Sequence, residues 1–397
     1  MTFPKLSRNP PLLLLLMTVI SAGGFALWHA LLNNFAVEAA QFTGAEIGIL
    51  QSLREIPGFL AFTTVFVLLL ITEQRFALVS LLLLGAGIAL TGVFPTVLGL
   101  YCTTVLMSIG FHYFETLSSS LTLQWTPKEH TAAFMGKLVA ARSLASLAVF
   151  AVLWLALEWA QMDYVWLYLV AGGGAVVAAL ILWIGFPQFP QAVTQHKHIV
   201  LRSRYWLYYL LTFMSGARRQ IFIVFAGFLM VEKFGYSAAD ITLLYLLNHL
   251  LSLFLAPRIG ALVGKIGERR ALTLEYIGLV VVFSGYAFAS SAYVAATLYV
   301  IDHVFFALAI AIKTYFQKIA DPRDIAATAS VSFTISHIAA VFIPVLFGLI
   351  WLQSPALVFL LGAAMAVVSL LLSRLIPDEP MAGQEIRRWP IALSARA

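Results

Sequence analysis

The stretch FPQFPQAVTQHKHIVLRSR, residues 186–204, decides how this chain is organised. It combines two prolines with two histidines and three lysine or arginine residues, and it is the longest polar interruption in an apolar sequence. Of the 397 residues, 61% are hydrophobic and 11% are charged, whereas a soluble domain averages roughly 45–50% apolar and about 25% charged residues. The composition excludes a water-soluble fold, and the stretch is predicted to link two membrane-embedded halves.

Apolar segments long enough to cross a bilayer lie on both sides of this linker. A window of about 19 residues predicts twelve spans, at residues 11–33, 44–71, 76–94, 97–122, 131–157, 163–185, 205–231, 238–263, 270–290, 293–319, 325–351 and 355–375. The predicted fold is an all-α polytopic membrane protein of two pseudo-symmetric six-helix bundles. The N-terminal bundle takes residues 1–185, the cytoplasmic linker 186–204, and the C-terminal bundle with a short cytoplasmic tail 205–397. The first apolar run is predicted to be a retained span, because its apolar character continues to Leu32.

The cations between the spans lie mostly on one side. If the N-terminus is cytoplasmic, the inner loops and tails hold Lys5, Arg8, Arg75, Lys128, Lys197, Arg202, Arg204, Lys265, Arg269, Arg270, Lys318, Arg323, Arg374, Arg387, Arg388 and Arg396, and the outer loops hold Lys233. The positive-inside rule therefore predicts cytoplasmic termini, in the inner or plasma membrane of a cell. Topology and contact with anionic headgroups of the lipid bilayer explain the net charge of +6, so no nucleic-acid partner is predicted. Because Cys102 is the single cysteine, disulfides and cysteine-based zinc sites are excluded.

The most specific local motif is GALVGKIGERR, residues 260–270, in the inner loop between the eighth and ninth predicted spans. Glycines allow two helices to approach through a tight turn. With the twelve spans and the two halves, this loop resembles that of the major facilitator superfamily, whose glycine and basic positions are matched by Gly260, Lys265, Gly267, Arg269 and Arg270. Two positions depart from the family pattern: Gly264 stands where an acidic residue is usual, and Glu268 where a basic one is usual.

Other departures leave the subfamily unidentified. The equivalent first-half loop, ITEQRFA at 71–77, has no glycine. Many proton-driven members have an arginine at the centre of span four, where this chain has His112 between two aromatic residues, and span five lacks the Gly-rich, Pro-containing pattern of drug antiporters. The resemblance implies a transporter that functions as a monomer without a cofactor, and not an enzyme.

Polar side chains inside the spans are the candidates for function, because an ionisable group near the bilayer centre costs at least about 2.5–3.5 kcal/mol. The predicted substrate-binding or coupling residues are Arg54, Glu55, His112, Glu115, Arg142, Arg218, His249, Asp302, His303 and His337. They fall on spans that line the central cavity in the resembled family. Glu275, on a supporting span, is the exception and is expected to reach the cytoplasmic interface. A shift of 191 residues aligns residues 110–115 with 301–306, a repeat typical of transporters built from two halves.

The spacing of these residues suggests roles. His112 and Glu115 lie at i and i+3 on one helical face, so they could exchange a proton. Arg142 and Arg218 are permanent cations near mid-span and favour an anion site. Salt bridges of Arg142 with Glu115, and of Arg54 with Glu55, remain the structural alternative.

Neighbouring residues on a helix point in different directions, so we expect the two members of an adjacent pair to have different roles. Asp302 and His303 are about 100° apart, and only one of them can point squarely into a cavity. Arg219 points about 100° away from Arg218 and is not expected to face the same ligand. Lys313 lies nearer the inner end, where its side chain can snorkel to the interface.

The leading functional hypothesis is a secondary active transporter of a small organic anion, coupled to protons, working by alternating access around a midplane cavity. The alternative is proton-driven multidrug efflux of amphipathic compounds. A membrane-embedded sensor or enzyme is a distant third, because no catalytic motif, nucleotide-binding loop or soluble domain is visible. No metal site is predicted, since Met107, His112 and Met214 lie on different helices without ligand spacing.

Overall fold

The computed structural model describes residues 8–42, 44–190, 193, 195, 196, 198–236 and 238–387. Within this part of the chain every regular element is helical, apart from an isolated β-bridge between Met381 and Gln384. Eleven of the described helical segments are long and apolar enough to cross a membrane. The protein is an all-α polytopic membrane protein, as predicted.

Five long helices of the first half match predicted spans. They are α1 (Pro10–Glu38), α4 (Glu73–Val93), α5 (Val97–Trp125), α6 (Lys128–Glu158) and α7 (Tyr164–Gly185). Side-chain caps set two of their starts: Asn9 Oδ1 accepts the Leu12 N–H at 3.0 Å, and Thr96 Oγ1 accepts the Gly99 N–H at 3.1 Å. Prediction and structure therefore agree where a long apolar run follows a capping residue.

The predicted second span, residues 44–71, is broken into three pieces and is not among the eleven. It consists of α2 (Gly44–Phe59), the 3₁₀ turn η1 (Leu60–Thr63) and α3 (Thr64–Val67). Pro57 lies inside α2, and proline removes a helical hydrogen bond. In the 3₁₀ turn that follows, the Phe62 N–H donates to Thr334 Oγ1 of the second half, at 3.0 Å. This bond compensates one backbone group that would be costly to leave unpaired in a membrane.

The second half contains two interrupted spans. Its elements are η2 (Ser203–Tyr205), α8 (Trp206–Ile221), the π-helical turn η3 (Phe222–Ala226), α9 (Gly227–Phe234), α10 (Ala238–Ile266), α11 (Glu268–Ala287), α12 (Ala292–Phe306), η4 (Ala307–Ala309), α13 (Ile310–Ile319), η5 (Pro322–Asp324), α14 (Ile325–Trp351) and α15 (Pro355–Ser373). Irregular turns therefore follow the last turns of α8 and α12, where Arg218, Arg219, Asp302 and His303 lie. Such turns are frequent at functional sites.

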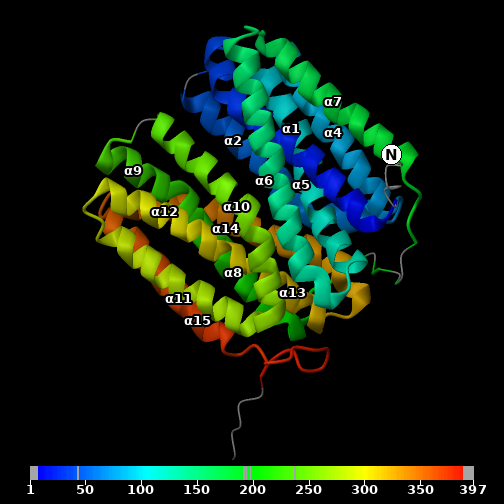
Figure 1. Ribbon diagram of the computed structural model, residues 1–397, viewed down its shortest axis with the longest axis vertical. Helices are drawn as coiled ribbons and strands as arrows, with labels where there is room; N and C mark the ends of the chain where they lie inside the picture. Colours follow the sequence, from blue (N-terminus) through cyan, green and yellow to red (C-terminus); the bar gives the residue numbers. More distant parts are fainter. Residues whose placement is uncertain are drawn as a thin grey trace, which may run out of the picture.

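Figure 1 shows the helices of the two halves as two groups, and each half has its own hydrophobic core. The core of the first half includes Trp28 and Phe114, and that of the second half includes Phe283 and Phe359. Large apolar side chains such as Ile184 are exposed on the outside, where lipid would cover them. Two bundles are therefore present, and the boundaries 1–185, 186–204 and 205–397 stay a proposal.

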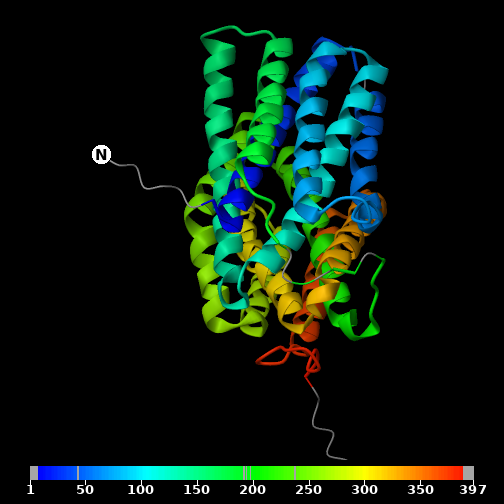
Figure 2. The ribbon, with the colours of Figure 1, turned by 90° about the vertical axis from the view of Figure 1, so that its right-hand side faces the viewer.

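The two halves meet most closely along α6 and α10 (Figure 1). A Cβ atom added at Gly136 would lie 2.3 Å from Ala256 O, and one added at Gly260 would lie 2.3 Å from Ala132 O. Both positions therefore need glycine for the helices to approach. Nearby, Gln317 Nε2 of the second half donates to Leu123 O of the first half at 2.6 Å. Figure 2 shows the linker, in green, running from the end of α7 to the second half.

Candidate functional site

Glu55, His112 and His337 meet between the halves, although they come from α2, α5 and α14. The Nε2 atoms of His112 and His337 lie 4.0 and 3.8 Å from Glu55 Oε2. The other carboxylate oxygen, Oε1, accepts hydrogen bonds from Arg54 Nη2 at 2.7 Å and Nε at 3.2 Å. We call Glu55, His112 and His337 the bridging triad. Arg54 flanks it, so four predicted site residues form one group.

Hydrogen bonds to the backbone fix both histidine rings of the bridging triad. His112 Nδ1 lies 3.0 Å from Ser108 O, and His337 Nδ1 lies 2.9 Å from Phe333 O. Because a carbonyl only accepts, Nδ1 is the protonated nitrogen in each neutral ring, and Nε2 carries the lone pair. Both lone pairs are therefore on the ring nitrogens nearest Glu55.

Glu115 and Arg142 form a second group. Arg142 Nη2 donates to Glu115 Oε1 at 2.8 Å and to Oε2 at 3.1 Å, the ion pair that the sequence left open. Arg219 on α8 and Lys313 on α13 both interact electrostatically with this pair. We call Arg142, Arg219, Lys313 and Glu115 the cationic cluster. It joins side chains of both halves and holds three cations for one carboxylate.

Arg219 and Lys313 are the members of the cationic cluster that the sequence prediction omitted. Both side chains are exposed although they lie within predicted spans. Arg219 also packs over the Phe306 ring, with 5.7 Å between the guanidinium carbon and the ring centroid. The sequence did indicate that Arg218 and Arg219 have different surroundings, because two adjacent arginines on a helix must face different neighbours. The sequence did not indicate which of them faces the other half. His112 and Glu115, predicted as a proton-exchanging pair, have different partners in the structure.

Arg218 is fully buried, with 0% of its surface exposed. Its described contacts are all within the second half: it donates to Ser369 Oγ, its Nη2 lies 3.6 Å from Glu275 Oε1, and its guanidinium carbon lies 4.6 Å from the Tyr276 ring centroid. The expectation that Glu275 reaches the cytoplasmic interface is wrong, because this side chain is 0% exposed and paired with Arg218.

Asp302 on α12 completes the surroundings of Arg218. It is 1% exposed, its carboxylate oxygens have no hydrogen-bond partner in the described structure, and it interacts electrostatically with Arg218 and Arg219. We call Arg218, Glu275 and Asp302 the buried acid cluster. Within it, two carboxylates share one arginine, so one bound proton would balance its charge.

His249 and His303 lie near each other and apart from the bridging triad. They interact electrostatically, His249 packs against the Phe150 ring at 6.1 Å, and His303 lines a small cavity with Asn248. The 191-residue shift makes His303 the counterpart of His112. Its surroundings differ, however, because Arg219 interacts with His303 whereas Glu55 faces His112.

The loop motif forms the tight turn between α10 and α11. Gly267, with φ of +83°, lies directly before α11 and needs glycine. Arg269 pairs with Asp378 beyond α15, and Lys265 and Arg270 are exposed. Glu268, which departs from the family pattern, is buried and pairs with Lys318 Nζ at 2.8 Å. The departure is thus compensated by a lysine from α13.

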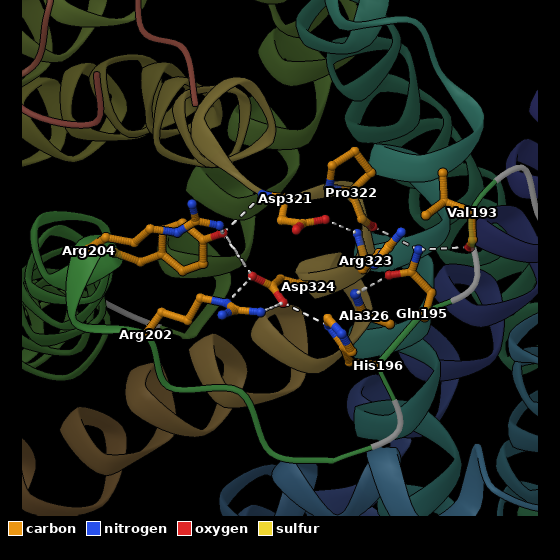
Figure 3. A network of polar contacts seen from close by, with 11 residues as sticks. Val193, Gln195, His196, Arg202, Arg204, Asp321, Pro322, Arg323, Asp324 and Ala326 are labelled. Carbon is orange, nitrogen blue, oxygen red and sulfur yellow. Dashed lines mark hydrogen bonds and ion pairs between the residues drawn. The ribbon is translucent and has the colours of Figure 1, made fainter. Parts of the chain in front are cut away.

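The linker is attached to the turn between α13 and α14 through Asp324 (Figure 3). This buried carboxylate accepts from Arg202 Nε at 2.5 Å and from Tyr205 Oη at 2.9 Å, and it lies 2.9 Å from His196 Nδ1. Hydrogen bonding to the carboxylate raises the pKa of Arg202 above its ordinary value. Gln195 Nε2 adds a bond to Pro322 O at 2.8 Å. We call these contacts the linker network. They hold the linker against the turn between α13 and α14.

The helical architecture defines a multi-pass membrane protein with polar side chains between its two halves. A family model described as Major Facilitator Superfamily matches residues 13–344. The chain therefore belongs to the major facilitator superfamily, and its subfamily is not identified.

Solved structures have the same fold at low sequence identity. The human organic anion transporter TETRAN is 13% identical, with a TM-score of 0.77 over 94% of this chain and 100% of that chain. The transporter FucP in its outward conformation is 13% identical, with a TM-score of 0.75 over 92% and 98%. The proton:xylose symporter XylE is 13% identical, with a TM-score of 0.72 over 95% and 97%. No curated protein matches the chain by sequence.

Proposed function

We propose that the protein is a secondary active transporter that moves a small organic anion in a proton-coupled cycle. The observation that carries this proposal is the cationic cluster, in which Arg142 donates to the single carboxylate of Glu115 and Arg219 and Lys313 interact electrostatically with this pair. Arginine donates a planar pair of N–H groups to carboxylate or phosphate. The excess of cations therefore favours an anionic substrate.

The position of the cluster suits alternating access. Arg142 and Glu115 belong to the first half, whereas Arg219 and Lys313 belong to the second. An anion bound among them would contact both halves, and rocking of the halves around it would expose it to each side in turn. We expect the monomer to complete this cycle.

The buried acid cluster is the proposed proton site. Glu275 and Asp302 share Arg218, and the ring hydroxyls of Tyr286 and Tyr299 are within electrostatic range of Asp302. A charged group inside a membrane needs compensation, so taking up a proton would relieve the unbalanced carboxylate. Arg219 interacts with both Asp302 and Glu115, and it therefore links the proton site to the anion site.

The orientation in the membrane is inferred from the distribution of cations, and the conformation from the contacts between the two halves. The positive-inside rule assigns the linker end to the cytoplasm of an inner or plasma membrane. At this end the Gln317 side chain of the second half donates to Leu123 O and Thr126 O of the first half, and the linker network ties the linker to the second half. We therefore infer that this conformation is closed to the cytoplasm and faces outward.

The fold permits such a cycle but does not select the substrate. Among proteins of the same fold, one is described as an organic anion transporter and another as a proton:xylose symporter. Multidrug efflux is the alternative, and the excess of cations in the cluster disfavours cationic drugs.

Flux into proteoliposomes tests the proposal. Purified full-length protein is supplied with labelled organic anions, neutral sugars and amphipathic cations, with and without an imposed pH gradient. We expect flux of at least one anion, and we expect the gradient to increase it. Flux of cations or sugars in preference to every anion would overturn the anion assignment, and flux that ignores the gradient would overturn the coupling.

A further inference from the structure

We propose that the bridging triad binds one divalent transition-metal ion, such as Zn²⁺, Fe²⁺ or Co²⁺, between the two halves. Glu55, His112 and His337 each offer one ligand atom, and the three atoms lie within 4.8 Å of one another. Two imidazoles and a carboxylate are a ligand set that proteins use for zinc and for non-haem iron. The proposal concerns binding, and it does not depend on the identity of the transported solute.

The histidine tautomers support a cation at this point. Each Nδ1 proton is directed at a backbone carbonyl oxygen, Ser108 O or Phe333 O. When both rings are neutral, two Nε2 lone pairs and the carboxylate oxygen Glu55 Oε2 therefore converge without a proton between them. Electron-rich atoms in this arrangement repel one another unless a cation lies among them. Hydrogen bonding of the remote ring nitrogen to a carbonyl is also the usual second contact of a metal-ligating histidine.

Ser108 gives independent evidence for the tautomer of His112. Its hydroxyl donates to Arg54 O, so its oxygen is left to accept from His112 Nδ1, 2.8 Å away. The same side chain thus connects the backbone of α2 to the ring of His112 on α5. This connection holds the ring with Nε2 directed at Glu55.

The two separations from Glu55 fit a metal after a small contraction. Zinc binds nitrogen and carboxylate oxygen at about 2.0–2.2 Å, so tetrahedral ligand atoms are separated by about 3.4 Å. The separations from Glu55 Oε2 to the two Nε2 atoms, 4.0 and 3.8 Å, exceed this by about half an ångström. Arg54 occupies Oε1, which leaves Oε2 as a single ligand atom. Three protein ligands would leave a coordination position for water or another small ligand.

Residue 58 must be glycine for the rings to reach this position. A Cβ atom added at Gly58 would lie 2.4 Å from His337 Cδ2 and 2.8 Å from His112 Cδ2. These are distances that real Cβ atoms do not adopt, so a methyl group would push the rings away from Glu55. The sequence Glu55-Ile-Pro-Gly58 therefore supplies a ligand and the space for the other two.

Metal binding would couple to the movement of the halves. Glu55 and His112 belong to the first half and His337 to the second, so a bound ion joins the halves in this conformation. A ligand that binds one state stabilises that state in proportion to its occupancy. The ion would therefore stabilise the conformation described here.

The test is a Co²⁺ titration of the full chain in detergent, purified with an affinity tag that contains no histidine and stripped with a chelator. Absorption bands of Co²⁺ report imidazole and carboxylate ligands, and calorimetry with Zn²⁺ gives the stoichiometry. We expect one saturable site per chain, weakened at least about tenfold in His112→Gln, His337→Gln and Glu55→Gln. The control His130→Gln removes an exposed histidine at the start of α6 and should bind as the wild type does.

Gly58→Ala keeps all three ligands. It therefore tests whether metal binding depends on the position of the histidine rings and not only on the presence of the ligand side chains. We expect it to lose Co²⁺ binding while its elution profile in size-exclusion chromatography stays that of the wild type. Zn²⁺ should also raise the melting temperature of the wild type and not that of Gly58→Ala. Absence of saturable Co²⁺ binding by the wild type would overturn the proposal. So would binding that survives in all three ligand variants, or binding that the His130→Gln control loses equally.

Discussion

Arg218 and Arg219 are adjacent in the sequence and have opposite surroundings. Arg218 is buried against α11 and α15, where Glu275 and Ser369 contact it. Arg219 is exposed, and its electrostatic partners include Arg142 and Glu115 of the other half. The rotation of about 100° between neighbouring helical residues is enough to separate them. Depth in the membrane therefore does not decide the role of a charged residue; the element that it faces does.

The clusters around these two arginines also differ in charge. The buried acid cluster has two carboxylates for one arginine, whereas the cationic cluster has three cations for one carboxylate. An excess of acid suits a proton, and an excess of base suits an anion. This difference in charge is the basis of the roles that we propose for the two clusters, and single substitutions can test it.

Arg218→Gln should have the largest effect on stability. It leaves Glu275 and Asp302 buried without their cation, and removing one partner of a buried ion pair costs about 3–5 kcal/mol. Thermal unfolding in detergent measures the loss. Arg219→Gln, which removes an exposed arginine from the same helix, should cost less than about 1 kcal/mol. Equal losses in the two variants would contradict the comparison.

Arg219→Gln should instead affect transport. Hydrogen bonds to charged groups contribute about 1.5–3 kcal/mol, so the KM for the transported anion should rise about 10–150-fold. The matched control is Arg258→Gln, which removes an exposed arginine on α10 whose Nη1 donates to Phe254 O of the same helix. If KM is unchanged in Arg219→Gln, this arginine does not contact the substrate.

Asp302→Asn should uncouple transport from protons. An amide has the shape of the acid but does not release a proton, so flux should stop responding to a pH gradient while exchange at equal pH continues. Flux measured against gradients of opposite sign tests this expectation. Asp163→Asn, an exposed position before α7, is the control. A variant that still follows the gradient would remove Asp302 from the coupling site.

Arg269→Gln should have the smallest effect. Its partner Asp378 is 64% exposed, and exposed ion pairs contribute about 0–1 kcal/mol. The variant provides a reference arginine outside the membrane for the two on α8. A loss as large as that of Arg218→Gln in thermal unfolding would show that burial does not explain the difference between them.

It was easier to predict from the sequence in which span each charged residue lies than to predict which side chains it contacts. The resemblance to the major facilitator superfamily is confirmed, and the apolar runs located the eleven long spans. The break after Pro57 was missed, because residues 44–71 are apolar enough to appear as one span. The environment of Glu275 was predicted wrongly, because its partner Arg218 is 57 positions earlier in the sequence.

The sequence by itself determined the class of protein, since hydropathy and the distribution of cations act locally along the chain. Only the tertiary structure decided which polar side chains meet. The long unbroken spanning helices, such as α5, α6, α10 and α14, are apolar on nearly every face, so no periodicity indicates which face turns toward a neighbour. The bridging triad and the cationic cluster each join residues from both halves, and the interactions of His337, Arg219 and Lys313 with the first half exist only because the halves pack together.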